Sequence, residues 1–330
     1  MKIAIVILNW NGKKLLQQFL PSVVQYSSQA EIYVIDNASE DDSINFLKKN
    51  YPSIRIIQNK ENYGFSKGYN EGLKSVEADI VCLLNSDVEV TENWITPIQK
   101  LFEKDERIAV VQPKLLDYKK KTHFEYAGAA GGFLDNLGYP FCRGRIFDTI
   151  EEDLGQYNDE IEIFWASGAV FFIRKHIFDE VGGLDEDYFA HQEEIDLCWR
   201  VKNKGYKIFY TYKSVVFHLG GATLSNMNPK KTFLNFRNSL FNLLKNNTLF
   251  KALLKIFLRL CLDGVAGIKF LFQRQFDHFF AIIRAHFSFY RFSLKMNNKR
   301  TISKKKNSFM VSKWIILEYF IKNKKKYTDL

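Results

Sequence analysis

The chain has 330 residues, of which 46% are hydrophobic and 25% charged, so it is long enough to bury a substantial core. This composition excludes a disordered or a fibrous protein. The net charge of +10 is unevenly distributed, because residues 225–330 carry 22 Lys and Arg against 4 Asp and Glu, whereas residues 1–224 carry 25 against 33.

Apolar runs alternate with helical patterns from the N-terminus onward. The first run is too short for a signal peptide and breaks into Asn-Trp-Asn-Gly, so we interpret it as a strand. Short apolar strands separated by helices predict an α/β protein with a doubly wound, mostly parallel sheet that is covered on both faces. The predicted strands are 3–8, 32–35, 54–57 and 80–84, and the predicted helices are 13–26, 41–50 and 66–76.

Polar side chains follow the predicted strands, at the sheet edge where ligands bind in such folds. Asp36 and its neighbour Asn37 could accept hydrogen bonds from a ribose or a base. Alternatively, Ser39 or Asp41 caps the next helix, which would still leave Asp36 free. The polar residues at these strand ends are Asn9, Asn11, Asp36, Asn37, Asn62 and Asp87.

The predicted strand 80–84 leads into the turn Asn85-Ser86-Asp87. A buried strand that delivers oxygen ligands to a sheet edge can hold Mg²⁺ or Mn²⁺ against a diphosphate, which indicates nucleotide-sugar chemistry. The alternative is that Asp87 only begins a turn. His218, which ends another apolar run, could supply an imidazole to the same metal or serve as a structural hydrogen-bonding residue.

Three glycines, Gly64, Gly68 and Gly72, are spaced by four residues around the start of a predicted helix, with Asn70 between the last two. Glycines allow a close approach of the backbone to a ligand, and a helix N-terminus favours phosphate. Close packing of the helix is the alternative use of such a spacing. The pattern is not G-x-G-x-x-G, so a nicotinamide enzyme is not supported.

The densest group of carboxylates lies between residues 185 and 196. Glu193 and Glu194 lie on a predicted helix and point about 100° apart, so one of them can face a cleft. A carboxylate held there could take a proton from an acceptor hydroxyl. The alternative is a solvated acidic face, on which Arg200 could pair with Asp196 at the helix surface.

Five segments, taken in order, resemble family 2 glycosyltransferases, and in particular the bacterial rhamnosyltransferase-like branch. The resemblance covers about residues 1–225. It implies the GT-A fold, which is a Rossmann-like doubly wound sheet, and an inverting, metal-dependent transfer from a nucleotide-diphosphate sugar. The five segments are Ile7–Gly12, Val34–Ser39, Asn62–Phe65, Leu84–Asp87 and Phe189–Leu197.

The resemblance also implies roles for individual residues. Asp87 would be the metal ligand of the family's D-x-D element, with Asn85 in place of the first acid. Glu193 and Glu194 take the place of the family's Glu-Asp pair, with Glu194 as the general base. The donor-binding residues would be Asn9, Asn11, Asp36, Asn37, Asn62, Gly64, Gly68, Asn70, Asn85 and Ser86, and the acceptor side would include Trp165, Gly168 and Asp185.

The chain is expected to divide at residue 225. Residues 1–225 would form the catalytic domain, with a nucleotide-sugar half at about 1–110 and an acceptor half at about 111–225. Residues 226–330 would form a basic, amphipathic helical region that associates with an anionic membrane surface. No window of about 20 residues there is free of charge, which argues against a spanning helix. A packing domain or a homodimer surface is the alternative, and nucleic-acid binding is not supported.

The expected function is the transfer of one sugar, from dTDP-rhamnose or a UDP-sugar, to a hydroxyl of a lipid-linked or cell-surface glycan precursor, with Mg²⁺ or Mn²⁺ as cofactor. This points to envelope polysaccharide biosynthesis. The four scattered cysteines favour a cytoplasmic protein, which would be peripheral on the inner face of the membrane. A sugar nucleotidyltransferase and a non-catalytic, membrane-bound scaffold that binds sugar nucleotides are the alternatives.

Overall fold

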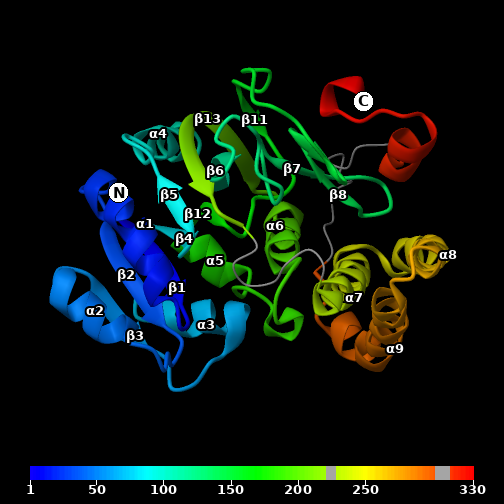
Figure 1. Ribbon diagram of the computed structural model, residues 1–330, viewed down its shortest axis with the longest axis horizontal. Helices are drawn as coiled ribbons and strands as arrows, with labels where there is room; N and C mark the ends of the chain where they lie inside the picture. Colours follow the sequence, from blue (N-terminus) through cyan, green and yellow to red (C-terminus); the bar gives the residue numbers. More distant parts are fainter. Residues whose placement is uncertain (221–227, 302–312) are drawn as a thin grey trace.

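The structure is a computed structural model that describes residues 1–220, 228–301 and 313–330. Its first part alternates strands and helices as the sequence predicts, with differences of one to three residues at most ends (Figure 1). These elements are β1 (Ile3–Asn9), α1 (Lys13–Tyr26), β2 (Glu31–Asp36), α2 (Ser43–Asn50), β3 (Arg55–Gln58), α3 (Gly64–Leu73) and β4 (Ile80–Asn85).

The second part is richer in short strands, most of which lie between residues 105 and 165, a segment rich in glycine and aromatic residues whose strands the sequence patterns do not predict. Its strands are β5 (Val88–Val90), β6 (Ile108–Asp117), β7 (Gly132–Leu134), β8 (Pro140–Cys142), β9 (Arg145–Ile146), β10 (Thr149–Ile150), β11 (Glu160–Glu162), β12 (Val170–Arg174) and β13 (Lys207–His218). Its helices are α4 (Thr96–Lys104), α5 (Lys175–Glu180), the short η1 (Glu186–Tyr188) and α6 (Glu193–Asn203).

Within the described residues, nine strands form one sheet in the order β11-β13-β6-β12-β4-β1-β2-β3, with β5 paired to β13. Strands β4, β1, β2 and β3 are parallel, as are β6 and β13, whereas β12 runs antiparallel between β4 and β6. The predicted mostly parallel α/β sheet is therefore confirmed. Its register places Asn9 beside Asp36 and Leu8 beside Asn85, so the predicted polar strand ends share one edge.

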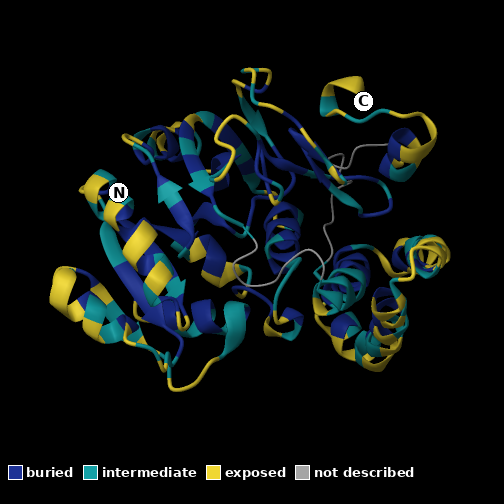
Figure 2. Cartoon of the chain, in the orientation of Figure 1, coloured by how far each residue is buried: buried dark blue, intermediate teal, exposed yellow. Residues whose placement is uncertain are grey.

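Alternate residues of the central strands face two separate cores, because successive side chains of a strand point to opposite faces. In β1, Ile3, Ile5 and Ile7 pack with α1, α2 and α4, whereas Ala4 and Val6 pack with α3, α5 and α6. Figure 2 shows the sheet strands buried between these helix layers. The sheet is thus covered on both faces, which leaves its carboxyl-terminal edge as the place for a ligand.

The C-terminal helices are α7 (Pro229–Asn246), α8 (Leu249–Phe272) and α9 (Phe276–Asn298). They lie on the opposite side of the molecule from β2 and β3 (Figure 1), and α7 contacts both α6 and α9. The last residues include η2 (Leu317–Ile321) and η3 (Tyr327–Asp329), and this segment packs against the small sheet β7–β10 through Ile315 and Tyr319. No helix in the described ranges is long and apolar enough to span a bilayer.

Candidate active site

The ends of β1 and β2 are joined by a buried network around Asp36. One carboxylate oxygen of Asp36 accepts from the Asn9 Nδ2 at 3.0 Å, and the other accepts from the backbone N of Ser39 at 3.0 Å. The Asn9 amide also donates to the Ser39 hydroxyl at 3.1 Å, while its own oxygen has no partner among the described residues. Asp36 is only 1% exposed, so this network fixes two predicted donor-binding residues in one place.

Asn37 holds the loop that leads into α3. Its amide nitrogen donates to the Asn62 Oδ1 and to the Gly64 carbonyl, at 3.0 and 2.9 Å. Its oxygen accepts from the Asn59 side chain and from the backbone N of Tyr63, at 2.9 and 3.3 Å. All four hydrogen-bonding positions of this amide are therefore used internally, so Asn37 shapes the donor loop.

Two other predicted donor residues also tie loops together. Asn11, with a positive φ of 50°, accepts from the backbone N of Glu40 at 2.7 Å and so joins the loops after β1 and β2. Asn70 donates to the Leu184 carbonyl and accepts from the Leu184 N, at 2.8 and 3.0 Å, which joins α3 to the segment before α6. Gly68 leaves room for Asn37, since a Cβ there would lie 3.1 Å from the Asn37 amide nitrogen. Direct contacts of these residues with a donor stay predictions.

The predicted metal ligands, Asp87 and His218, lie together although 131 positions separate them. Strand β13 pairs with β5 so that His218 is opposite Val88, and its Nε2 lies 3.2 Å from the Asp87 Oδ1. Sequence analysis missed a third residue, Glu125, whose Oε1 lies 3.2 Å from the His218 Nδ1. It belongs to the irregular segment after β6, where no sequence pattern indicated a functional residue.

The charges around His218 favour a cation. Burial by itself lowers the pKa of His218, but the carboxylates of Glu125 and Asp87 outweigh it and raise this pKa to about 10. The two buried carboxylates that stabilise a positive charge on His218 could stabilise a divalent cation in the same way. Among the described residues, however, no group of three or more His, Cys, Asp and Glu side chains is arranged to enclose a metal. The remaining ligands would have to come from elsewhere.

The acidic pair Glu193 and Glu194 begins α6. Burial raises the pKa of Glu194 to about 7, and burial together with the charge of Glu194 raises the pKa of Glu193 well above its ordinary value. Each has one carboxylate oxygen without a hydrogen-bond partner among the described residues. Gly168 lies against this group, because a Cβ on it would be 3.7 Å from the Glu194 Cδ. Gly168 therefore lies beside Glu194, and its predicted place on the acceptor side stays a prediction.

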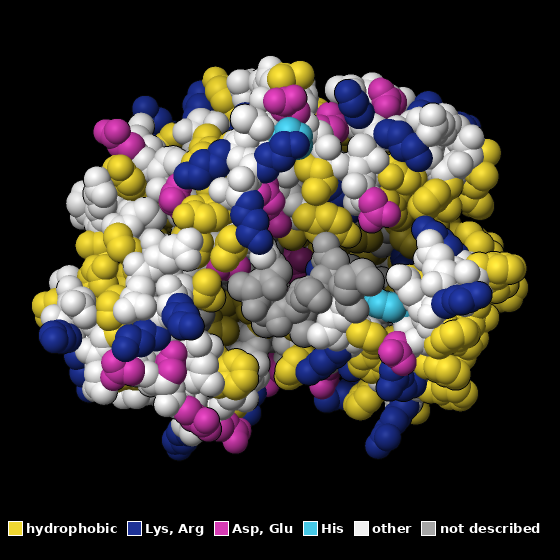
Figure 3. Space-filling view, in the orientation of Figure 1, with side chains coloured by type: hydrophobic (Ala, Val, Ile, Leu, Met, Phe, Trp, Pro, Cys, Tyr) yellow, Lys and Arg dark blue, Asp and Glu magenta, His cyan; other side chains and the backbone are white. Residues whose placement is uncertain are grey.

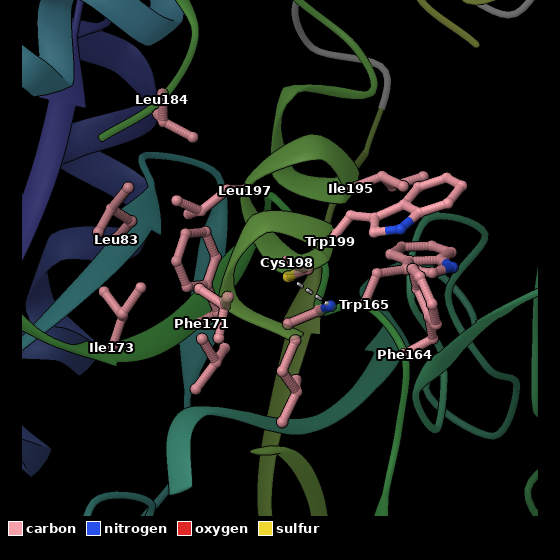
Figure 4. Close-up of a cluster of buried hydrophobic side chains, with 14 of the residues drawn as sticks. Leu83, Phe164, Trp165, Phe171, Ile173, Leu184, Ile195, Leu197, Cys198 and Trp199 are labelled. Atoms are coloured by element: carbon pink, nitrogen blue, oxygen red, sulfur yellow. Dashed lines mark hydrogen bonds between the residues drawn. The ribbon is translucent and has the colours of Figure 1, made fainter. Parts of the chain in front are cut away.

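The other side of α6 packs into an aromatic core that fixes its position. Figure 4 shows Trp199 and Cys198 of α6 beside Phe164 and Trp165, and the backbone N of Ala166 donates to the Cys198 Sγ at 3.4 Å. Trp165 is 3% exposed, and its indole N–H donates to the Phe133 carbonyl at 2.9 Å. The indole is therefore part of the core that packs against α6, and its predicted contact with an acceptor stays a prediction.

The remaining carboxylates of this region pair with the C-terminal helices. Asp185 contacts the Nζ of Lys245 and of Lys299, both at 2.6 Å. An acceptor that bound Asp185, as the sequence predicts, would have to compete with these lysines. Asp196 pairs with Arg200 at 2.8 Å and with Lys245 at 2.8 Å. The predicted Asp196–Arg200 pair is present but buried, whereas a pair at the helix surface was expected.

The chain is similar to known glycosyltransferases in sequence and in fold. The family described as Glycosyl transferase family 2 matches residues 4–182, more than half of the chain. The matched range contains Asp87 and ends before Glu193 and Glu194. The low-salt glycan biosynthesis hexosyltransferase Agl10 of Haloferax volcanii is 21% identical over 286 residues, which cover 84% of this chain and 87% of that protein.

A second relative is the N-acetylglucosaminyl-diphospho-decaprenol L-rhamnosyltransferase of Mycobacterium tuberculosis, which is 24% identical over 222 residues, or 62% of this chain and 71% of that protein. Among solved structures, the mannosyltransferase PcManGT from Pyrobaculum calidifontis, in complex with GDP-Man and Mn²⁺, aligns with a TM-score of 0.55. The alignment has 10% identity and covers 88% of this chain and 87% of that one, so the likeness extends over most of both folds.

Proposed function

The chain belongs to glycosyl transferase family 2, whose members transfer a sugar from a nucleotide sugar, and from this premise we propose an inverting transfer with Glu194 as the general base. The observation that carries the proposal is the meeting of three chain segments at one edge of the sheet. Asp87 and His218 contact each other there. Two residues before Asp87, the backbone N of Asn85 donates to the carbonyl of Ala169, which is next to the Gly168 that packs on Glu194.

A divalent cation fits this edge. Asp87 and His218 would hold it, and oxygens of the donor diphosphate and water would complete its coordination, as is usual for Mg²⁺ and Mn²⁺ with nucleotide substrates. When bound, the cation supplies positive charge that stabilises the departing diphosphate. Asn9 and Asp36, at the ends of neighbouring strands, would contact the nucleoside. The donor is proposed to be dTDP-rhamnose or a UDP-sugar, and the name of the mycobacterial L-rhamnosyltransferase supports rhamnose as the sugar.

The side chains on the acceptor side perform the proton transfer. The Glu194 carboxylate takes the proton of the acceptor hydroxyl, whose oxygen forms a bond to the anomeric carbon. The bond from that carbon to the diphosphate oxygen breaks, and its electron pair leaves with the nucleoside diphosphate. Inversion follows because attack and departure take place on opposite faces of the sugar. A pKa of about 7 lets Glu194 both accept and release this proton near neutral pH.

The acceptor is proposed to be lipid-linked, with the enzyme peripheral on an anionic membrane. Helices α8 and α9 expose large apolar side chains next to basic residues, and Figure 3 shows hydrophobic side chains gathered on the side where these helices lie. Such a face suits an interfacial helix pair. The exposed apolar residues are Leu249, Phe250, Leu253, Leu254, Phe257, Val265, Ile268, Phe272, Phe276, Phe280, Phe287, Tyr290 and Leu294.

The donor site is tested by calorimetry with UDP, dTDP, GDP and ADP, each with and without Mn²⁺. We expect one nucleoside diphosphate to bind at least tenfold more tightly with Mn²⁺ than without it. Asp87→Asn should remove this dependence on Mn²⁺. Glu89→Gln is the control and should keep it, because Glu89 lies two residues from Asp87 but its side chain pairs with Lys121. If no nucleotide binds the wild-type protein, a non-catalytic role is favoured. An unchanged Mn²⁺ dependence in Asp87→Asn would remove Asp87 from the metal site.

Membrane attachment is tested by sedimentation with vesicles that contain anionic lipid. Phe250, Phe257 and Phe272 are 81%, 63% and 86% exposed on α8, so replacing all three by Ser should reduce the bound fraction severalfold without loss of folding. Leu154→Ser is the matched control, because Leu154 is 80% exposed but far from these helices in the sequence. Equal binding of the triple variant and the wild type would exclude α8 as the anchor.

A further inference from the structure

The loop that precedes Glu193 and Glu194 has an unfavourable backbone conformation. Phe189, His191 and Gln192 have φ angles of 66°, 66° and 72°. Residues other than Gly, Asn and Asp rarely adopt such positive φ angles. Each such residue is strained, because its Cβ lies close to its own backbone in this conformation. Three of them within four positions will persist only if the surroundings hold the loop from outside.

Asn238 of α7 provides much of this restraint. Its side chain is fully buried, and its Nδ2 lies 3.1 Å from the Tyr188 carbonyl, 3.0 Å from that of Ala190 and 2.7 Å from that of His191. One amide group therefore serves three carbonyls of the same short loop. Its own oxygen accepts from the Arg237 Nε at 2.9 Å, which fixes the orientation of the amide.

Neighbouring residues of α7 extend the same contact. The Arg237 Nη2 donates to the carbonyls of Asp187 and Tyr188, at 3.2 and 3.1 Å. The Tyr188 hydroxyl donates to the Asn242 Oδ1 at 2.7 Å, and the Asn242 amide lies 3.4 Å from the Gln192 carbonyl. One face of α7 thus contacts the whole loop, from Asp187 to Gln192.

The end of this loop determines where the acidic pair lies. Gln192 is the N-cap of α6, and its carbonyl accepts from the backbone N of Asp196 at 3.0 Å. Any relaxation of the loop would therefore move the first turn of α6, which carries Glu193 and Glu194. A displacement of about 1 Å at a reacting group can lower a rate by about a hundredfold.

We propose that Asn238 is a positioning residue, which holds the Phe189–Gln192 loop so that Glu194 faces the acceptor hydroxyl. The C-terminal helix α7 thereby completes a site whose other parts come from residues 1–220. This inference rests on the proposed role of Glu194 as the base. It predicts that Asn238 affects the chemical step and leaves the nucleotide side unchanged, because no hydrogen bond links Asn238 to the described residues of that side.

The test compares Asn238→Ala with Asn235→Ala, a control on the same helix whose side chain makes no hydrogen bond to the described residues. Turnover is measured as nucleoside diphosphate release from dTDP-rhamnose or UDP-glucose, according to which nucleotide binds. We expect kcat of Asn238→Ala to fall at least tenfold while nucleotide affinity with Mn²⁺ stays within twofold of wild type. The acid limb of its kcat profile should move to lower pH, because a relaxed loop admits water to Glu194.

Unchanged kcat and an unchanged acid limb would overturn the proposal. So would a parallel loss of kcat and nucleotide affinity, which would show a general structural role. If Asn238→Ala does not fold, Asn242→Ala decides the question. We expect its kcat to fall severalfold while its nucleotide affinity stays unchanged. If kcat and nucleotide affinity of Asn242→Ala fall together, or neither falls, the proposal is refuted. Wild-type turnover is measured first, so that absence of transfer counts against the proposed function and not against the role of Asn238.

Discussion

The two sides of the candidate site differ in how their polar groups are satisfied. On the nucleotide side, both oxygens of Asp36 accept hydrogen bonds from neighbouring loops, and Asn37 uses all of its hydrogen-bonding positions. On the catalytic side, Glu193 is buried and Glu194 partly buried, and each keeps one oxygen without a partner in the described part of the chain. Apart from the Asn9 oxygen, the nucleotide-side groups are bonded to one another, whereas the acidic pair keeps unpaired carboxyl oxygens.

This difference suits the nucleotide side to ligand binding and the catalytic side to proton transfer. Hydrogen bonds among loop residues fix a shape before the ligand arrives, which reduces the entropy lost on binding. A buried carboxylate without partners costs free energy, and that cost appears as a raised pKa, which suits a group that must take a proton near neutral pH. The comparison therefore predicts that changes on the catalytic side act on kcat and that changes on the nucleotide side act on affinity.

The largest effect is expected from Glu194→Gln. The amide cannot accept the hydroxyl proton, so kcat should fall by about 10²–10⁴-fold, while nucleotide affinity in the presence of Mn²⁺ stays unchanged. Steady-state kinetics with calorimetry on the same preparation measures both quantities. Glu193→Gln is the comparison variant, because it removes the neighbouring carboxyl of the same pair. A greater loss of kcat in Glu193→Gln would assign the base to Glu193.

A smaller effect, on the other side of the site, is expected from Asp36→Asn. This change removes a charged acceptor that organises Asn9 and Ser39, so we expect the Kd of the nucleoside diphosphate to rise about tenfold, with kcat at saturating donor changed by less than threefold. Asp42→Asn serves as the control, since Asp42 is exposed and pairs only with nearby groups such as Lys13. A loss confined to kcat would contradict the division between the two sides.

The nucleotide side was largely predictable from the sequence, and the reason is topological. Parallel strands end at the same edge, so polar residues that follow them must gather there, as Asn9 and Asp36 do. The same reasoning placed His218 at a strand end and proposed it as a second ligand of the metal at Asp87, beside which it lies. Glu125 could not be predicted, because its segment has no periodicity and its position depends on long-range packing.

The catalytic side was predictable only in part, because its supports are distant in the sequence. Glu194 was identified by its motif, but Asp185 was assigned to the acceptor without knowledge of Lys245 and Lys299, which lie 60 and 114 residues further on. One signal was available. The asparagines of α7 recur every four residues, on one face of a helix for which asparagine has low propensity, and this spacing indicates a polar contact surface. These residues are Asn238, Asn242 and Asn246.

The smallest effect is expected from lowering the pH from 8 to 7, and it depends on the catalytic side alone. Because the pKa of Glu194 is raised to about 7, the carboxylate that accepts the proton is lost as pH falls through 7. At saturating donor, kcat should fall about twofold between pH 8 and 7 and approach a tenfold loss per unit below pH 6. Burial raises the pKa values of Cys142 and Cys198 to about 11 and about 12, above this range. Burial and the charge of Glu194 also raise the pKa of Glu193 well above its ordinary value, so the profile reports the acidic pair.

Glu194→Gln provides the control for this profile, since its residual activity should not change between pH 6 and 8. A wild-type kcat that stayed constant down to pH 5.5 would mean that the base has an ordinary pKa and is open to water. The catalytic side would then resemble the nucleotide side, and the burial of Glu194 would have no role in the chemistry.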